Sequence, residues 1–342
     1  MIIYDDIINV LQPMGGISVL FSKIQKDLQR KGVNYKIVPS SASCGRLSPV
    51  RYSRFLVPSD DDLVGNIFHS TYYRIPKGKN IRTITTVHDF THEKIIGGVR
   101  KLIMSHQKEC AIKRSDLIIC VSNNTKLDLI EYFPNVDESS IRVIYNGVGP
   151  EFFPIAKSGI DFGLRKNIVF IGQRAGYKNF DILISALSMI DDIGVCCVGG
   201  GKFTRKELSF LEKTIPGRYR HLGYISVDEL NEEYNKALCL VYPSSYEGFG
   251  IPIVEAMKAG CPVIAYKSSS IPEVAGDAAI LLEHLSAEEL VGAINRICDE
   301  SVWSRVRKKG LLQATKFSWE ETVNRTFSAY EEVLGKRLSR HF

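Results

Sequence analysis

Short apolar runs alternate with amphipathic segments along almost the whole chain, and this rhythm restricts the fold more than any other feature. DLIICVS (116–122) and NIVFIG (167–172) are apolar runs of strand length, whereas residues 17–32 and 228–237 have helical spacing. Strands that alternate with helices are typical of parallel α/β structure, because each crossover helix returns the chain to the same edge of the sheet. The pattern therefore predicts α/β domains with doubly wound parallel sheets.

The length of the chain and one irregular segment predict two domains. A chain of 342 residues is too long for one ordinary core. Residues 150–165 show neither period and contain Pro and Gly, which indicates a linker. We expect one Rossmann-like domain over 1–155 and a second over 156–318, with a helix over 319–342 that packs back on the first. Such domains bind ligands at the carboxyl ends of their strands, so a cleft is expected where those ends face each other.

Composition argues against export and against a membrane-spanning protein. No apolar run approaches the roughly 18 residues that a membrane span requires. Asp5 and Asp6 stand where a secretory signal would carry Lys or Arg. The eight cysteines form no CxxC pair, which favours free thiols in a reducing compartment. We therefore expect a cytoplasmic protein.

The positive charge lies in the first half of the chain. Residues 1–157 carry 21 Lys and Arg against 15 Asp and Glu, whereas residues 158–342 carry 23 of each. Such a half suggests an anionic partner, namely a phosphorylated substrate, anionic lipid or nucleic acid. The segment 92–116 mixes basic and apolar residues, among them Arg100, Lys101 and Lys108. It is either a packed helix with a solvated face or a surface for an acceptor or for anionic lipid at the inner face of the plasma membrane.

The strongest motif is the segment 241–281, in which a buried strand leads through a glycine-containing turn into a helix. Pro252 stands near the first turn of that helix, and Gly248 and Gly250 allow a ligand to approach the backbone. The amide groups of Phe249, Gly250 and Ile251 would project from the helix N-terminus, which favours a phosphate group. Glu247 and Glu255 stand eight residues apart, one before the helix and one inside it.

This segment resembles the Glu-x7-Glu signature of glycosyltransferase family 4, whose members are retaining enzymes of the GT-B fold. Further stretches similar to that family are PMGGIS (13–18), TVHDF (86–90), VSNNTKLDLI (121–130), VIYNGV (143–148), IGQRAGYKN (171–179), VGGG (198–201) and HLGYIS (221–226). The resemblance covers nearly the whole chain. It implies transfer of a sugar from a nucleoside diphosphate sugar, with GDP and UDP both open. The first domain would bind the acceptor and the second the donor.

The resemblance also assigns donor-binding roles. Arg174 and Lys178 would neutralise the charge that grows on the leaving diphosphate, which stabilises the transition state more than the ground state. Glu255 would accept hydrogen bonds from the ribose hydroxyls, and Glu247 would orient hydroxyls of the transferred sugar. Gly200 would permit close approach of the nucleotide.

The remaining assignments concern the base, the donor loop and the sugar. Tyr224 and Ile225 match the stretch that holds the base. Gly15 and Gly16 would cover the donor phosphates and the acceptor. His88, at a strand end, would position the donor sugar. No second carboxylate forms a nucleophile with Glu247, so double displacement is not supported and front-face retention is implied.

The acidic stretch SDDD (59–62) is similar to the metal-binding motif of the other major transferase fold, but no buried strand precedes it. It is better explained as a solvated loop, so neither a metal nor another cofactor is expected. The predicted partners are a nucleotide sugar, a glycan or lipid-linked glycan acceptor and an anionic membrane surface, without nucleic acid. The expected function is synthesis of a bacterial surface polysaccharide such as O-antigen or capsule. The alternatives are a GT-B sugar-nucleotide epimerase and a non-catalytic sugar-nucleotide-binding protein.

Overall fold

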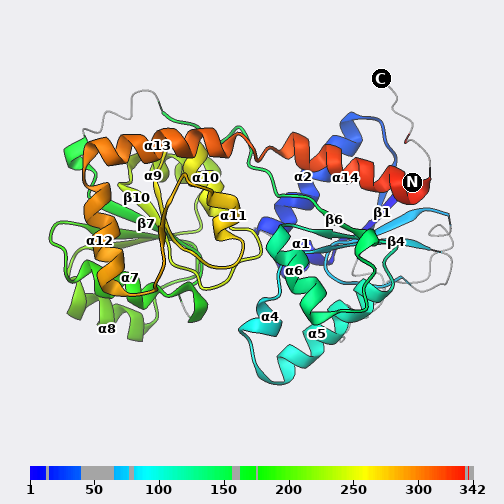
Figure 1. The fold of residues 1–342 in the computed structure, drawn as a ribbon, viewed down its shortest axis with the longest axis horizontal. Helices are drawn as coiled ribbons and strands as arrows, with labels where there is room; N and C mark the ends of the chain where they lie inside the picture. The colour runs from blue at the N-terminus through cyan, green and yellow to red at the C-terminus, as the bar shows by residue number, and fades with distance from the viewer. Residues whose placement is uncertain are drawn as a thin grey trace. The chain divides into compact units, whose positions relative to one another are not determined.

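The computed structural model describes residues 1–12, 15–39, 65–76, 81–155, 162–174, 176–335 and 338. The chain divides into two compact units (Figure 1). Unit 1 comprises Met1–Asn146 and Trp319–Phe342, and unit 2 comprises Gly147–Ser318. The acidic stretch 59–62 lies outside the described residues, as do Pro13 and Met14 of the PMGGIS stretch.

Unit 1 contains a six-stranded parallel sheet in the order β2-β1-β3-β4-β5-β6. Its strands are β1 (Ile2–Asp5), β2 (Tyr35–Val38), β3 (Ile67–Ser70), β4 (Arg82–Val87), β5 (Leu117–Cys120) and β6 (Ile141–Val143). The central strands β3 and β5 are buried along their whole length, as expected for strands covered on both faces. The order reverses between β1 and β3, which makes that point the ligand-binding crevice expected of a doubly wound sheet.

The helices of unit 1 are α1 (Ile7–Leu11), α2 (Gly16–Arg30), α4 (Thr91–Lys94), α5 (Gly98–Lys113), α6 (Asn123–Tyr132) and α14 (Trp319–Leu334). Ser122 caps α6 by accepting a hydrogen bond from the Thr125 amide. The segment 92–116 contains two helices rather than one, because Gly97 and Gly98 interrupt it.

The C-terminal helix α14 packs into the core of unit 1. Val323, Phe327 and Tyr330 lie in the same apolar cluster as β1 and α2. The Tyr330 hydroxyl lies 2.7 Å from the Tyr4 hydroxyl and 2.7 Å from His69 Nδ1. A buried polar chain therefore ties the last helix to strands β1 and β3.

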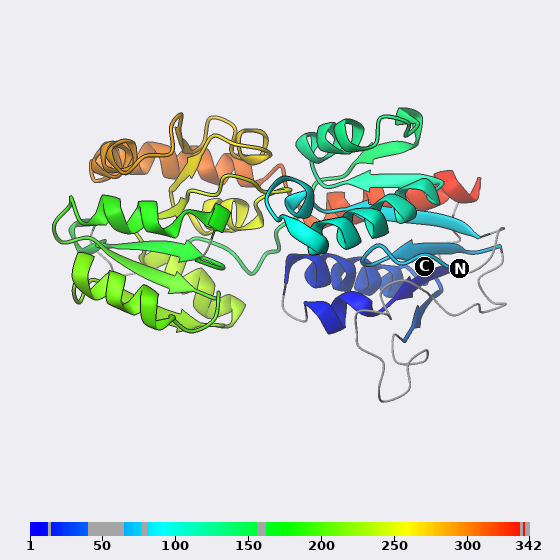
Figure 2. The ribbon, with the colours of Figure 1, turned by 90° about the horizontal axis from the view of Figure 1, so that it is seen from below.

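Unit 2 repeats the architecture with the strand order β12-β11-β10-β7-β8-β9. Its strands are β7 (Asn167–Ile171), β8 (Gly194–Val198), β9 (Tyr219–Gly223), β10 (Cys239–Tyr242), β11 (Val263–Tyr266) and β12 (Ile280–Leu282). Its helices are α7 (Phe180–Leu187), α8 (Arg205–Thr214), α9 (Val227–Lys236), α10 (Ile251–Ala259), α11 (Ile271–Ala275), α12 (Ala287–Ile297) and α13 (Glu300–Ala314). Figure 2 shows helices on both faces of the sheet in each unit. The strand order reverses between β7 and β10, so the crevice of this unit lies at their carboxyl ends.

The boundary between the units differs from the expected one. The sequence predicts a linker over 150–165, but the chain divides at 146/147, and residues 147–155 belong to unit 2. Asn231 Oδ1 and Asn235 Oδ1 of α9 accept hydrogen bonds from the amides of Phe153 and Ile155 at 3.1 and 2.8 Å. These side-chain amides replace the hydrogen bonds that regular structure would supply, so an aperiodic segment is nevertheless held in place.

Candidate functional site

The candidate donor site lies at the carboxyl ends of β7 and β10 in unit 2. A short 3₁₀ turn, Gly176–Lys178, follows β7 and presents Lys178. The Lys178 ammonium forms an ion pair with Glu247 and lies 3.2 Å from the hydroxyl of Tyr242, the last residue of β10. The structure thus brings together two residues that the sequence singles out although they are far apart in the chain.

Asn179 locks the loop after β7 to the loop after β10. Its backbone is left-handed, with φ of 51°, a conformation that Asn tolerates better than most residues. The side-chain amide donates hydrogen bonds to the carbonyl oxygens of Tyr177 and Pro243 at 2.9 and 2.8 Å, and to Ser245 Oγ at 2.8 Å. Asn179 therefore fixes Lys178 relative to the turn that carries Glu247.

Consecutive serines, which the sequence motifs do not single out, hold the Glu247 turn. The Glu247 amide donates to Ser269 Oγ at 2.9 Å. The Ser270 hydroxyl donates to the carbonyl oxygens of Glu247 and Phe249 at 2.9 and 3.1 Å. The signal for these residues was the run Ser268–Ser270 directly before an Ile-Pro pair, since short hydroxyl side chains compete for backbone groups in turns.

The N-terminus of α10 opens directly after this turn. Gly250 is its N-cap residue and has φ of 94°, which favours glycine, and Pro252 stands in the first turn. Because the first amide groups and the helix dipole carry positive charge, the end of α10 is suited to an anionic group.

Glu255 lies one turn further along α10, beside Tyr234 of α9. The Tyr234 hydroxyl lies 3.3 Å from Glu255 Oε2 and 3.3 Å from the Pro252 carbonyl oxygen. Burial raises the pKa of Glu255 to about 7; the hydrogen bond from Tyr234 opposes this rise, and the charge of Glu151 adds to it. The carboxyl group is therefore half ionised near neutral pH. Sequence reasoning missed Tyr234, because nothing in a local pattern links α9 to α10.

Arg174 occupies a different environment from the one expected of a phosphate ligand. Its buried guanidinium donates from Nε to Glu207 Oε1 at 2.9 Å. The other nitrogens, Nη1 and Nη2, lie 2.9–3.4 Å from the carbonyl oxygens of Gly199, Gly200, Gly201 and Lys202. Each guanidinium nitrogen thus has an acceptor within the protein. The structure places Arg174 beneath the glycine turn after β8, next to the predicted residue Gly200.

Tyr224 and Ile225 follow β9 at the same edge of the sheet. Tyr224 is 73% exposed, and Ile225 is half-buried. An exposed aromatic ring beside a positive-φ glycine, Gly223, offers a flat apolar surface. That surface suits the stacking of a base.

In unit 1, His88 follows β4 directly. It is 9% exposed, and within the described part of the chain its Nε2 has no hydrogen-bond partner. Burial lowers the pKa of His88 to about 4; the charge of Asp89 opposes this effect, whereas the charge of Lys108 adds to it, so the imidazole is neutral at physiological pH. A neutral ring with an open nitrogen is suited to a hydrogen bond with a ligand hydroxyl.

Lys108 is buried in unit 1, close to the segment that follows His88, and is not part of a basic surface. Its ammonium donates to the Asp89 carbonyl oxygen at 2.7 Å and pairs with Glu93 at 2.8 Å, and both side chains are buried. The ammonium also lies 4.2 Å from the centre of the Phe90 ring. Of the two alternatives for the segment 92–116, the packed helix therefore describes Lys108, because its charge is paired with Glu93 inside the unit and not exposed to a partner.

Gly15 and Gly16 begin α2 beyond the carboxyl end of β1. Gly15 is the N-cap residue, and its amide donates to Ser18 Oγ at 3.1 Å. A Cβ atom on Gly15 would lie 2.0 Å from the side chain of Gln12, which would have to move to accommodate it. These two residues and His88 belong to unit 1, whereas the other predicted site residues belong to unit 2.

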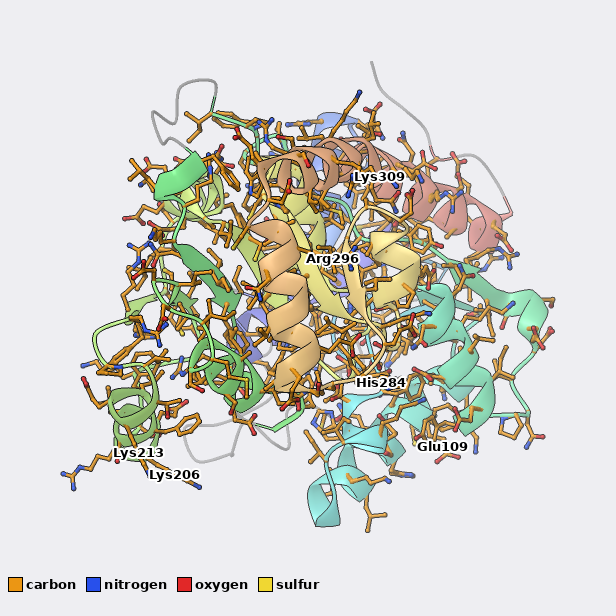
Figure 3. The ribbon with its side chains drawn as sticks, turned by 60° about the vertical axis from the view of Figure 1, so that its left-hand side comes forward. Glu109, Lys206, Lys213, His284, Arg296 and Lys309 are labelled. Atoms are coloured by element: carbon orange, nitrogen blue, oxygen red, sulfur yellow. The ribbon has the colours of Figure 1, made fainter. Side chains whose placement is uncertain are left out.

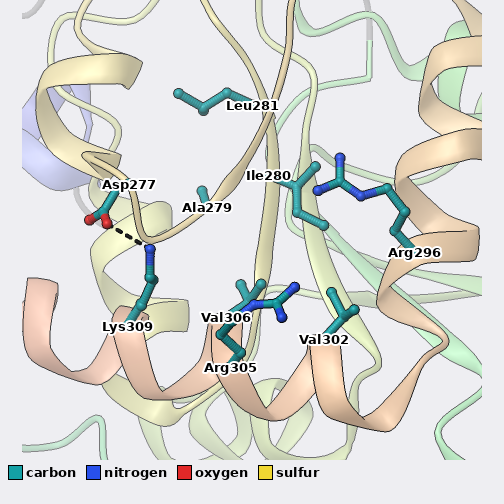
Figure 4. A pocket seen from close by; sticks show the side chains of 9 residues that line it. All are labelled: Asp277, Ala279, Ile280, Leu281, Arg296, Val302, Arg305, Val306 and Lys309. Atoms are coloured by element: carbon teal, nitrogen blue, oxygen red, sulfur yellow. Dashed lines mark hydrogen bonds and ion pairs between the residues drawn. The ribbon is translucent and has the colours of Figure 1, made fainter.

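A cavity of about 270 Å³ lies elsewhere in unit 2 (Figure 4). Arg296, Arg305 and Lys309 surround an apolar floor that includes Val302, and Lys309 pairs with Asp277 at 2.7 Å. Figure 3 shows Arg296 and Lys309 on the helices α12 and α13. The cavity lies at the amino end of β12, so it is not part of the site at the carboxyl ends.

Among the residues that the structure describes, no cluster of three or more His, Cys, Asp or Glu side chains could hold a metal ion. Within the same residues, every helix is too short or too polar to cross a bilayer.

Comparison with known protein families gives two matches that follow each other along the chain. Residues 50–152 match the family described as Glycosyltransferase Family 4, and residues 157–310 match Glycosyl transferases group 1. The chain is 39% identical over 119 residues to the O-antigen chain mannosyltransferase B of Escherichia coli. That match covers 34% of this chain and 31% of the relative, so it spans about a third of the relative's length.

Solved structures share the fold. Sucrose-phosphate synthase from Thermosynechococcus elongatus superposes with a TM-score of 0.80 at 17% identity, covering 98% of this chain and 99% of that one. The Anabaena protein HepE, in complex with UDP and glucose, superposes with a TM-score of 0.70 at 16% identity, covering 96% and 98%. Together with the two parallel six-stranded sheets, these similarities confirm the predicted GT-B fold.

Proposed function

We propose that this chain, which belongs to the group 1 glycosyl transferases of glycosyltransferase family 4, transfers a sugar from a nucleoside diphosphate sugar to a glycan acceptor with retention of configuration. One arrangement carries the proposal. At the carboxyl ends of β7 and β10 in unit 2, Lys178 is paired with Glu247. The N-terminus of α10 follows Glu247 directly, and α10 carries Glu255. A cation and a helix N-terminus recognise phosphate, and two carboxylates recognise hydroxyl groups.

Each group has a chemical task in this proposal. When the bond to the sugar breaks, negative charge grows on the diphosphate, and Lys178 and the α10 dipole stabilise it. Glu255 accepts hydrogen bonds from the ribose hydroxyls. Glu247 orients hydroxyls of the transferred sugar, and its ion pair holds the Lys178 ammonium beside the reacting bond.

The ion pair between Lys178 and Glu247 also affects how the configuration of the transferred sugar is retained. The carboxylate of Glu247 is paired with Lys178, and Ser269 accepts a hydrogen bond from its backbone amide, so we regard the carboxylate as poorly suited to act as a nucleophile. We therefore favour attack of the acceptor on the face that the diphosphate leaves, with a phosphate oxygen taking the acceptor proton. His88, neutral and with Nε2 open, contributes a hydrogen bond to the sugar rather than acid catalysis.

We place the surface that meets a membrane-borne acceptor on α5. Leu102 and Ile103 are 70% and 46% exposed and stand beside Lys101. Exposed apolar side chains next to basic ones suit the surface of an anionic membrane. Similarity to an O-antigen mannosyltransferase supports an acceptor in a bacterial surface polysaccharide, carried on a lipid at the cytoplasmic face.

Ligand binding and product analysis test the proposal. UDP and GDP are each added to the protein at about 100 times the dissociation constant, and one of them should stabilise the fold by about 2.7 kcal/mol in thermal unfolding. The matching nucleotide sugars are then incubated with glycan acceptors, and the anomeric configuration of the product is determined by NMR. Retention in a glycan product supports transfer. A 2-epimerised nucleotide sugar without an acceptor would instead show an epimerase, and stabilisation without any product would show a binding protein.

A further inference from the structure

The surroundings of Arg174 assign it a role different from direct contact with the donor. The guanidinium is enclosed by Glu207, by the ring of Phe203 at 4.7 Å and by four consecutive carbonyl oxygens. We propose that Arg174 is a positioning residue, which orients the peptide groups of residues 199–202 so that their amides bind a phosphate group of the donor. This inference rests on the function proposed above.

The peptide geometry gives the direction of these amides. The described part of the chain contains no cis peptide, and in a trans peptide the C=O and N–H bonds point in opposite directions. Because the carbonyl oxygens of Gly199, Gly200 and Gly201 converge on Arg174, the N–H groups of Gly200, Gly201 and Lys202 point away from it. Among the described residues, none of these three amides has a hydrogen-bond acceptor.

The backbone of this turn strongly favours glycine. Gly199, Gly200 and Gly201 have φ values of 71°, 70° and 74°, a region that side chains strongly disfavour. A Cβ on Gly200 would also lie 2.2 Å from the Gly172 carbonyl oxygen, which belongs to the loop after β7. Consecutive amides that face one direction form a concave anion-binding surface, since each adds a partial positive charge.

The turn is also in the right place. It follows β8, which pairs with β7 in parallel, so it lies at the same edge of the sheet as Lys178. Arg174 strengthens the three amides as donors, because a cation bound to the carbonyl side polarises the peptide groups. Glu207 completes the arrangement by neutralising the buried guanidinium and by capping α8 through the Thr204 amide at 2.6 Å.

The experiment compares how variants bind nucleoside diphosphates and nucleosides. Arg174→Lys and Glu207→Gln, singly and together, are titrated calorimetrically with UDP, GDP, uridine and guanosine. Gln can still accept the capping hydrogen bond but lacks the charge that holds Arg174. We expect each single variant to bind the diphosphate about tenfold more weakly, with nucleoside affinity unchanged, and the double variant to be no weaker than either single one. Unchanged nucleoside affinity also shows that the variants are folded.

A matched control and two contrary outcomes complete the test. Lys206→Gln removes an exposed cation from the next helix, α8, and should leave both affinities unchanged (Figure 3). If Arg174 instead contacts the phosphate directly, Glu207 competes with the ligand, and Glu207→Gln will bind diphosphate as tightly as the wild type or more tightly. That result, or an equal loss of nucleoside affinity in the variants, would overturn the inference. A wild-type protein that binds neither UDP nor GDP would instead refute the proposed function.

Discussion

The titration of Glu255 provides a direct test of the donor site. If this carboxylate accepts the ribose hydrogen bonds, only its ionised form binds the nucleoside. With a pKa of about 7, most of the carboxyl groups are ionised at pH 8 but only about one in ten at pH 6. Nucleoside affinity should therefore fall by about tenfold between pH 8 and pH 6, whereas a carboxyl group with an ordinary pKa would give a flat profile over that range.

Two variants connect this profile to the structure. Glu255→Gln should bind weakly and independently of pH. Tyr234→Phe removes the hydrogen bond that opposes the rise in pKa, so the midpoint of the profile should move to higher pH. The assay is calorimetric titration with uridine and guanosine from pH 5.5 to 8.5, because neither ligand carries a phosphate that titrates there. A flat wild-type profile with undiminished affinity at pH 6 would refute the assignment of Glu255.

The same shift affects stability in the opposite direction. The folded pKa lies above the value of 4.5 expected in the unfolded chain, so between those two values the folded state binds more protons. The contribution of Glu255 to the free energy of unfolding is therefore greatest at low pH and is lost as the pH rises towards 7. Donor affinity and this contribution to stability consequently have opposite pH dependences.

Four further predictions concern other parts of the molecule. Lys178→Ala should lower kcat by about 100-fold, as loss of a transition-state charge partner does, in a transfer assay at saturating donor. Excess EDTA should leave transfer intact; loss of activity restored by Mn²⁺ would contradict this. Tyr330→Phe leaves His69 Nδ1 buried without its partner, and should lower the free energy of unfolding in urea by about 1–3 kcal/mol. Replacing Leu102 and Ile103 by Asn should reduce co-sedimentation with anionic vesicles while nucleotide affinity stays unchanged; equal sedimentation of both proteins would leave α5 as an ordinary surface helix.

The periodic elements could be predicted from the sequence, but one edge strand could not. Apolar runs predict β7, β10 and β11 because both faces of these strands are buried. The sequence of β9, YRHLG, contains two basic side chains, and its residues are largely half-buried. An edge strand is paired on one side only, so its burial pattern lacks the apolar continuity that identifies a central strand.

The sequence indicates the charge of each predicted site residue but not the partner that the charge meets in the fold. The sequence presents Arg174 and Lys178 as cations without partners, but in the structure Lys178 is paired with Glu247 and Arg174 with Glu207. Lys108 and Arg174 are buried against acceptors that depend on tertiary structure, namely Glu93 and a series of backbone carbonyls. Local sequence gives the sign of a side chain but not its partner across the fold. The serines that hold Glu247 were missed for the same reason.

Unit 1 is built from two separate stretches of the chain, and this affects how the protein folds as it is synthesised. Unit 2 is encoded without interruption, whereas unit 1 needs α14, whose Tyr330 hydroxyl meets Tyr4 and His69 in its core. Domains generally fold in the order in which they leave the ribosome. Here the order is reversed: the second unit can complete its core first, and the first must wait for the helix that follows. We therefore expect the N-terminal strands to keep apolar surface exposed during translation until α14 has been made, and to depend on chaperones for that time.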